Sequence, residues 1–443
     1  MVEGEERSII RQRNDKPRSA VVGSSRPRLL DVLGPGLITG ASDDDPSGIA
    51  TYSQAGAKFG FELSWTLILT FPLMVIVQAI SARIGRTTGR GIAGNVRKYY
   101  PNWLLQLLVG LLFVANTLNI GADLGAMAEA TRLLVPVPAA WVYILIYSII
   151  CTAGQIFFQH SRYVSLLKWL TLTLFAYFAV LLFVRISWLD LLRGLVIPGL
   201  RFDREFWLMV VAILGTTISP YLFFWQASQE VEDTKAHPQR EPLRIKPHQA
   251  PNALARIQLD TLVGMGLSNL VALAIVVTTA ATLPAAGVRE VTTAAQAALA
   301  LKPLAGPFAF AVFALGIVGT GLLAVPVLAG SAAYAIGEAR GWRVGLAQLP
   351  LQAKAFYSTI AVATLLGALG NVLSVSPLKA LVWAAVINGI VAVPVMALLM
   401  LMATNRRVMG PFCISKAWAT MGWAATVIMA AATVAFTVTS GRG

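Results

Sequence analysis

Ser42-Asp43-Asp44-Asp45-Pro46-Ser47-Gly48 places three carboxylates and two helix-breaking residues inside an otherwise apolar stretch of the chain. Apolar residues run from about Val32 to this segment, and mostly small and apolar residues follow from Ile49 to Phe61. A charge near the middle of a bilayer costs at least about 2.5 to 3.5 kcal/mol, so such acids usually face a bundle interior, a wet cavity or an ion. Pro46 and Gly48 predict a broken helix with freed carbonyl oxygens. Carboxylates beside such carbonyls indicate a site for a hard cation.

A second helix break is expected far downstream, in Gly215-Thr216-Thr217-Ile218-Ser219-Pro220-Tyr221, halfway along an apolar run from Phe206 to Ala227. This segment offers hydroxyl and carbonyl oxygens without a charge. Two interrupted helices at corresponding positions of two halves indicate a secondary transporter whose site lies where the halves meet. We therefore expect the two breaks to face each other.

The composition is that of a polytopic membrane protein. The chain has 443 residues, of which 56% are hydrophobic and 13% charged, and its mean hydropathy is +0.69. About eleven apolar windows are long enough to cross a bilayer. The expected spans are 32–57, 62–83, 103–133, 139–159, 163–185, 205–229, 254–282, 304–336, 355–373, 377–403 and 416–439. The sequence thus predicts an all-α membrane protein.

The net charge of +14 reflects where the basic residues lie along the chain. A cytoplasmic N-terminus places most of the 35 Lys and Arg on the cytoplasmic side, as the positive-inside rule requires. An odd number of spans then puts the C-terminus outside. Contact with a lipid bilayer explains the basic excess better than nucleic-acid binding. With only two cysteines, no disulfide framework or zinc cluster is expected.

Polar residues inside other spans are candidates for the ion path or for gating. Asn116, Asn119 and Asp123 fall at i, i+3 and i+7, on one face of the third span. This stripe serves either an ion or hydrogen bonds between helices. Asn269 and Asn388 are open to the same two interpretations. Tyr221 and Gln226 of the sixth span are also candidates for the ion path or for gating. None of the three histidines lies within a span.

Several segments together resemble the natural resistance-associated macrophage protein (NRAMP) family of divalent-metal transporters. They are Gly34-Pro35-Gly36, Asp45-Pro46-Ser47-Gly48-Ile49-Ala50-Thr51, Gln54-Ala55-Gly56-Ala57, Gly215-Thr216-Thr217-Ile218-Ser219-Pro220, and Met409-Gly410 after Arg406-Arg407. The resemblance implies a LeuT-type fold of two inverted five-helix repeats plus an eleventh helix. We accordingly expect a disordered tail at 1–30, repeats at 31–190 and 205–404 joined by an external linker at 191–204, and a last segment at 405–443.

The departures from that family concern its metal ligands. The family's first break reads Asp-Pro-Gly-Asn, and both its Asp and its Asn bind metal. Here Asp45 is kept, but Gly48 stands in place of the Asn. The methionine sulfur and alanine carbonyl of the family's second break correspond to Ser219 and Thr216. Losing the sulfur favours a hard ion, and smaller side chains predict a larger cavity for an ion that keeps its waters.

Residues linked to proton coupling differ as well. Family members that import protons carry histidines in the second half of span 6, where this chain has Tyr221 and Gln226, and a Glu where it has Ala126. Histidine titrates near neutral pH and suits a proton relay, so its loss predicts weak or no coupling.

The pattern of these departures most resembles that of the divergent NRAMP-related magnesium transporters. Asp44 is expected to contact the metal indirectly, through water or another ligand. Asp43 is open between an ion contact, an aqueous vestibule and a pair with a nearby base.

The sequence therefore predicts a monomeric cell-membrane transporter that imports Mg²⁺, and also Mn²⁺, as substrate. It holds the ion with Asp45, Gly48, Thr216, Ser219 and Asp44, and needs no cofactor. The first alternative is a proton-coupled Mn²⁺ or Fe²⁺ importer. A sodium-coupled carrier of organic solutes is disfavoured because three acids would repel a substrate carboxylate. An intramembrane enzyme is disfavoured because no nucleophile–base or metal motif is present.

Overall fold

The computed structural model describes residues 39–40, 42–157, 172–237, 239–373 and 376–441, all of which belong to the unit Pro35–Gly443. The expected tail at 1–30, Gly34-Pro35-Gly36, His160 and much of the expected fifth span lie outside the described residues. The longer helices are α4 (Pro46–Phe59), α5 (Trp65–Thr88), α7 (Asn102–Arg132), α8 (Ala140–Phe157), α12 (Arg204–Thr217), α13 (Pro220–Ala236), α14 (Ala250–Thr282), α17 (Ala309–Arg340), α18 (Lys354–Gly370), α19 (Pro377–Thr404) and α21 (Lys416–Ser440).

Shorter helices connect these elements. They are α6 (Ile92–Tyr99), α10 (Phe175–Val180), α11 (Trp188–Val196), α15 (Ala294–Ala298), α16 (Lys302–Ala305) and α20 (Arg406–Met409). The structure assigns no strand to any residue that it describes. Eight helical stretches in the described part are long and apolar enough to cross a membrane, and α18 is a shorter apolar helix.

Both predicted helix breaks are present. Residues 42–43 are helical, residues 44–45 are not, and α4 begins at Pro46. Likewise α12 ends at Thr217, and α13 begins at Pro220 after two non-helical residues. Proline has no N–H to donate, so it is tolerated at the first position of a helix but not in its interior. Each proline thus starts the second half of a broken span.

The structure extends or adds helices that the apolar windows did not predict. The helix α13 continues to Ala236, past the expected end at 229. The helix α11 crosses the expected boundary between the first repeat and the linker at 191–204. Leu191 and Gly194 of α11 are buried while Trp188 and Leu192 are exposed. A short helix with one buried face lacks the twenty apolar residues by which a membrane span is recognised.

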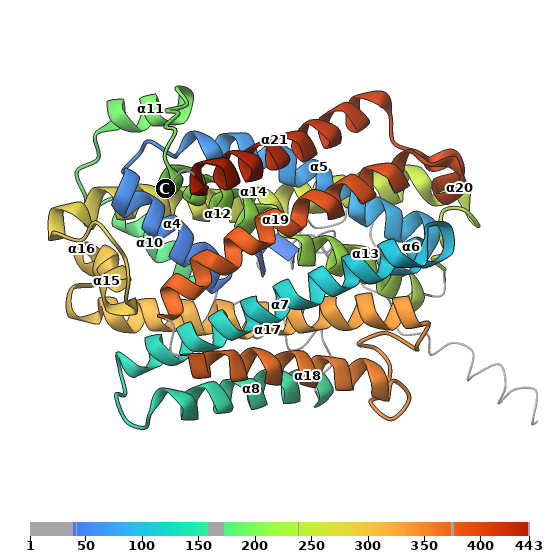
Figure 1. The fold of residues 1–443 in the computed structure, drawn as a ribbon, viewed down its shortest axis with the longest axis horizontal. Helices are drawn as coiled ribbons and strands as arrows, with labels where there is room; N and C mark the ends of the chain where they lie inside the picture. Colours follow the sequence, from blue (N-terminus) through green and yellow to red (C-terminus); the bar gives the residue numbers. More distant parts are fainter. Residues whose placement is uncertain (1–38, 41, 158–171, 238, 374–375, 442–443) are drawn as a thin grey trace, which may run out of the picture. The chain divides into compact units, whose positions relative to one another are not determined.

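The helices form two groups with α19 against both (Figure 1). One group contains α7, α8, α17 and α18, and the other contains α4, α5, α13 and α14, while α19 packs on α7, α4 and α12. Close approach within the first group depends on glycine, because a Cβ at Gly121 would lie 2.5 Å from the Gly367 carbonyl oxygen. The helices that flank the two breaks contact α7 and α19. The half-helices α4 and α13 contact both, and α12 packs on α19.

Candidate metal site

Asp45 is the first residue of the site because it caps the half-helix α4. Its Oδ1 accepts hydrogen bonds from the Gly48 backbone N–H at 2.8 Å and from the Ser47 hydroxyl at 2.6 Å. An aspartate at this position satisfies N–H groups that a helix start leaves unpaired, and the helix dipole favours its negative charge. The break thus fixes one carboxylate oxygen and leaves the other directed at neighbouring helices.

The second oxygen of Asp45 meets two side chains from other elements. Asn119 of α7 donates its Nδ2 to Oδ2 at 3.3 Å, and the Tyr221 hydroxyl of α13 donates to the same oxygen at 3.4 Å. The Tyr221 hydroxyl also lies 3.1 Å from the Ser42 carbonyl oxygen. Both bonds to Oδ2 are longer than usual for hydrogen bonds to a carboxylate. A cation could therefore replace them at little cost.

The second break contributes Thr216 and Ser219. Ser219 is the N-cap residue of α13, and its hydroxyl lies 2.7 Å from the Gly215 carbonyl oxygen and 3.0 Å from that of Thr216. A carbonyl oxygen has two lone pairs, so the Thr216 carbonyl can accept this bond and still face an ion. The side chain of Thr216 approaches the first break, with its Oγ1 3.4 Å from the Ser47 hydroxyl. The two breaks therefore meet, as the sequence predicted.

Gly48 is packed more tightly than the sequence led us to expect. A Cβ built at this position would lie 3.3 Å from the Thr216 Oγ1, 3.3 Å from the Tyr52 ring and 3.5 Å from the Asp43 carbonyl oxygen. The prediction of a larger cavity beside Gly48 is therefore wrong for this conformation. Thr216 of α12 and Tyr52 of α4 fill the space beside Gly48. Water that hydrates a bound ion can enter this space only if α4 and α12 move apart.

Asp43 and Asp44 share one hydrogen-bond partner from another helix. The Ser268 hydroxyl of α14 lies 2.7 Å from the Asp43 Oδ2 and 3.0 Å from the Asp44 Oδ1. A hydroxyl has a single proton to donate, so it can satisfy only one of two carboxylates at a time. Asp44 thus competes with Asp43 for this hydroxyl, and its place in the metal site stays a prediction.

The remaining candidate residues are buried but are not all brought together. Asn116 donates its Nδ2 to the Leu328 carbonyl oxygen at 2.9 Å, which links α7 to α17. Asp123, one turn along α7 from Asn119, has neither carboxylate oxygen in a hydrogen bond. Gln226 accepts a hydrogen bond from the Thr39 hydroxyl. Both polar side-chain atoms of Asn388 and the Oδ1 of Asn269 are buried without a partner.

Two serines that were not predicted as functional residues, Ser47 and Ser268, bind the three acids. Ser47 ties Asp45 to Thr216, and Ser268 binds the other two acids. A serine two residues after an aspartate at a helix start is a recognisable signal of helix capping. Ser268 carried no such signal, because its partners lie more than two hundred residues away and only the fold brings them close.

The chemistry of the site is that of oxygen donors around one central carboxylate. Asp45, Thr216, Ser219 and Asn119 are all buried. Across the described ranges, no three His, Cys, Asp or Glu side chains are grouped so as to hold a metal ion. Such a site lacks the thiolate or imidazole cluster that retains a transition metal permanently. It suits an ion that is bound and released.

The family described as "Natural resistance-associated macrophage protein-like" matches residues 36–439. The chain is 27% identical over 309 residues to the divalent metal cation transporter MntH of Erwinia tasmaniensis, covering 68% of this chain and 70% of that protein. It is 27% identical over 308 residues to MntH of Yersinia enterocolitica, covering 68% and 70%.

Two solved structures bear on the fold. The manganese transporter of Eremococcus coleocola superposes with a TM-score of 0.74 at 16% identity, covering 96% of this chain and 90% of that one. The inward-facing conformation of Mhp1 superposes with a TM-score of 0.53 at 13% identity, covering 93% and 91%. These likenesses confirm the predicted LeuT-type fold of two inverted five-helix repeats plus an eleventh helix. The boundaries of the repeats stay a prediction.

Proposed function

This chain belongs to the NRAMP-like family, and from that premise we propose that it is an alternating-access transporter that imports a divalent metal ion, foremost Mg²⁺ and also Mn²⁺, with weak or no proton coupling. Its relatives are transporters, and it is not an enzyme. The observation that carries the proposal is that Ser47 links the Asp45 carboxylate to Thr216 of the second helix break, where neutral oxygens are available.

The choice of ion follows from these donors. Sulfur and imidazole favour borderline transition metals, while carboxylate, carbonyl and hydroxyl oxygens suit Mg²⁺, Ca²⁺ and Mn²⁺. Mg²⁺ loses its waters reluctantly and is usually held by one or two carboxylates with several waters retained. Ser219 replaces the family's methionine sulfur, so the softest ligand is missing. The donor set therefore favours Mg²⁺ over Fe²⁺.

The proposed ligands are Asp45 Oδ2, the Thr216 carbonyl and the Ser219 hydroxyl, with waters completing the shell. Asn119 joins them if its amide rotates, because its Oδ1 is buried without a partner and the rotation turns that oxygen toward Asp45. Tyr221 then releases Oδ2 and keeps its bond to the Ser42 carbonyl. Gly48 and Asp44 enter the shell only when the half-helices separate.

Uptake of such an ion needs no partner ion. A membrane potential of 100 mV is worth about 2.3 kcal/mol per elementary charge, or about 4.6 kcal/mol for a divalent cation. The positions at which proton-coupled relatives carry histidine hold Tyr221 and Gln226. Both make hydrogen bonds to the first broken span, through Ser42, Asp45 and Thr39. We therefore assign these two residues to packing of the breaks rather than to proton transfer.

A second candidate function is proton-coupled Mn²⁺ or Fe²⁺ import, and one observation favours it. Asp123 is buried in α7, and neither of its oxygens has a hydrogen-bond partner. Burying an unpaired carboxylate is costly, so this side chain is suited to carry a proton. If protons accompany the metal, Asp123 is the residue that should bind them.

The experiment is Mg²⁺ influx into proteoliposomes that contain the purified protein and a trapped pH-sensitive dye, with Mn²⁺ as competitor. We expect saturable Mg²⁺ entry that Mn²⁺ inhibits and that leaves the internal pH unchanged. Mn²⁺ entry with acidification and without Mg²⁺ entry would instead establish the proton-coupled alternative.

The proposal includes a position in the cell membrane with the N-terminus on the cytoplasmic side. It also includes a monomeric state.

A further inference from the structure

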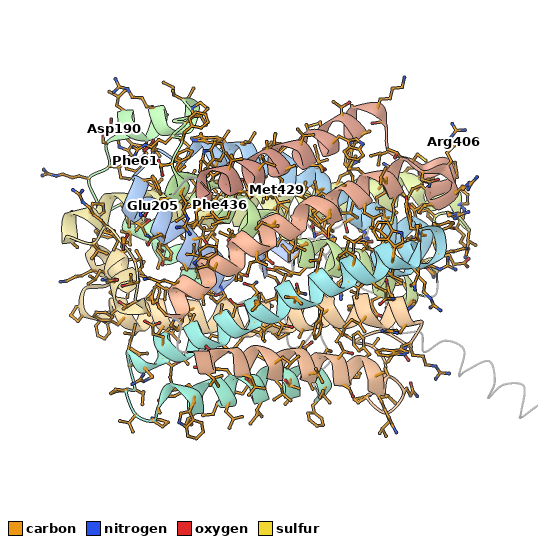
Figure 2. The ribbon with its side chains drawn as sticks, in the orientation of Figure 1. Phe61, Asp190, Glu205, Arg406, Met429 and Phe436 are labelled. Atoms are coloured by element: carbon orange, nitrogen blue, oxygen red, sulfur yellow. The ribbon has the colours of Figure 1, made fainter. Side chains whose placement is uncertain are left out.

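A cavity of about 210 Å³ lies at the end of the bundle where α4 finishes, far along α4 from Asp45. It is enclosed by α4, α12, α19 and the link between α14 and α15. Its charged and polar lining residues are Gln54, Lys58, Glu205, Glu290, Thr292 and Lys379. Figure 2 shows Glu205 at this end of the molecule, near Phe61 and Asp190, and Arg406 at the opposite end.

Lys58 holds the two acids of this cavity together. Its Nζ lies 2.6 Å from the Glu205 Oε2 of α12 and 3.5 Å from the Glu290 Oε1 of the link. The Lys58 side chain is 23% exposed, and those of Glu205 and Glu290 are 65% and 63% exposed. Ion pairs that are this exposed add little to stability, so another cation can compete for the carboxylates.

A polar helix face connects the cavity with the metal site. Ser47, Thr51, Gln54 and Lys58 are spaced at i, i+4, i+7 and i+11, which places them along one side of α4. At one end Lys58 meets Glu205, and at the other Ser47 meets Thr216, so α4 and α12 run together over the whole distance. Thr51, midway between, is fully buried and its hydroxyl has no hydrogen-bond partner.

We propose that this cavity is an entry site for the divalent cation, in which Glu205 and Glu290 bind the ion after it displaces the Lys58 ammonium. The inference rests on the proposed function for the identity of the ion. The ammonium occupies the position between two carboxylates that a divalent cation would take. A double charge attracts the two carboxylates more strongly than a single one, so Mg²⁺ or Mn²⁺ competes better than Na⁺ or K⁺.

From the cavity the ion passes along the face that carries Gln54 and Thr51 to Ser47 and Asp45. The unpaired Thr51 hydroxyl is the oxygen that this path offers between the two sites. The displaced Lys58 stays in the cavity as a positive charge and repels a second cation.

The test compares variants that act on the cavity in opposite directions. Replacing both acids, Glu205→Gln with Glu290→Gln, should raise the KM for Mn²⁺ or Mg²⁺ uptake about three- to tenfold at low ionic strength and leave Vmax unchanged. Lys58→Met should lower the KM, because it frees both carboxylates. Added monovalent salt should shrink both effects.

Glu62→Gln is the matched control. Glu62 forms an ion pair with Arg201, with Oε2 2.5 Å from Nη2, at the same end of the molecule and outside the lining of this cavity. We expect its KM to match that of the unaltered protein. Two results would exclude the entry site: a KM that the double variant leaves unchanged, or a KM that Lys58→Met and the double variant shift in the same direction. The ion pairs of Lys58 with Glu205 and Glu290 would then serve only to hold the helices together.

A binding measurement separates this inference from the transport proposal. Mn²⁺ bound to purified Asp45→Ala, Lys58→Met protein is counted from the loss of the free-ion electron paramagnetic resonance signal. We expect one bound ion, which disappears when Glu205→Gln and Glu290→Gln are added. Binding that persists after those changes would overturn the entry site. If binding behaves as expected but the unaltered protein transports nothing, the site stands and the transport function falls.

Discussion

The two helix breaks differ in what they offer an ion. The first offers charge, since Asp45 caps α4 and keeps one oxygen free of strong partners. The second offers neutral oxygens, and Ser219 already bonds the carbonyls of Gly215 and Thr216. Under the proposed function, attraction for a divalent ion comes from the first break. Discrimination between ions is then expected from the second break, where the residue type at position 219 sets the softness of the site.

The breaks also differ in how tightly they are packed. A Cβ at Gly215 would lie 2.1 Å from the Ala385 carbonyl oxygen and 2.5 Å from the Gly389 nitrogen, both of α19. The nearest atoms to a Cβ at Gly48 are 3.3 Å away, and the closest is the end of the Thr216 side chain. Beside the second break, Gly215 is therefore packed against the backbone of α19, whereas at the first break the nearest neighbours of Gly48 are side-chain atoms.

The largest expected effect follows from removing the charge of the first break. Asp45→Ala should reduce divalent-ion uptake at least about 100-fold, which corresponds to about 2.7 kcal/mol, because neutral oxygens alone do not compensate a divalent ion. Uptake is measured in proteoliposomes, and a symmetric size-exclusion peak shows that the variant is folded. The control is Asp190→Asn, a charge at the surface near Phe61 (Figure 2). Near-normal uptake by folded Asp45→Ala protein would remove this residue from the mechanism.

The packing difference predicts unequal effects of adding one methyl group. Gly215→Ala should destabilise the folded protein by about 1 to 3 kcal/mol, because α12 and α19 must separate to admit a Cβ. Gly48→Ala should have a much smaller effect, because the Thr216 side chain can adjust. Thermal unfolding in detergent measures both. Equal melting temperatures for the two variants would show that the second break is no more rigid than the first.

Changing the neutral donor should alter selectivity more than rate. Ser219→Met supplies a sulfur ligand and should shift the preference between Mn²⁺ or Cd²⁺ and Mg²⁺ by about tenfold toward the softer ions. Ser219→Ala is the matched variant that removes the hydroxyl without adding sulfur, and it should leave the preference unchanged. Competition between the ions in an uptake assay measures the ratio. An unaltered ratio in Ser219→Met would exclude this side chain as a ligand.

The smallest effect on uptake is expected at Ser268, whose hydroxyl contacts both Asp43 and Asp44. Ser268→Ala leaves Asp43 and Asp44 without their shared hydroxyl, so it should destabilise the protein by about 1 to 3 kcal/mol and reduce uptake only a few-fold. Thr282→Val is the control, because its hydroxyl bonds only to Thr278 of the same helix. If uptake falls as far as in Asp45→Ala, then Asp43 or Asp44 is a direct ligand.

Much of the fold could be predicted from the sequence, because the membrane restricts the chain to apolar helices of a known length. Proline marked both breaks because it has no N–H to donate inside a helix. That the two breaks meet was expected from the arrangement of two repeats. The helix α11 was not predicted, because its nine residues are too few for a span. The end of α13 was missed because its last turns are polar, and buried contacts rather than hydropathy keep them helical.

The site was predictable where one residue type fixes the chemistry and less so where packing does. Asp45 was found because a carboxylate in a membrane demands an explanation. The partners of Asp45 from α7 and α13, Asn119 and Tyr221, were named as path residues, but their bonds to it were not expected. The closed space beside Gly48 could not be read from residue sizes, since it depends on how near the two half-helices lie.

The central claim is that Asp45 and neutral oxygens form a site for a hard divalent ion, and calorimetric titration of the purified protein tests it most directly. In a Glu205→Gln, Glu290→Gln background, which removes the proposed entry site, we predict that one Mg²⁺ ion binds, that Mn²⁺ displaces it, and that adding Asp45→Asn removes this binding. Undiminished Mg²⁺ binding by folded Asp45→Asn protein in this background, or binding of Mn²⁺ without any binding of Mg²⁺, would contradict the claim.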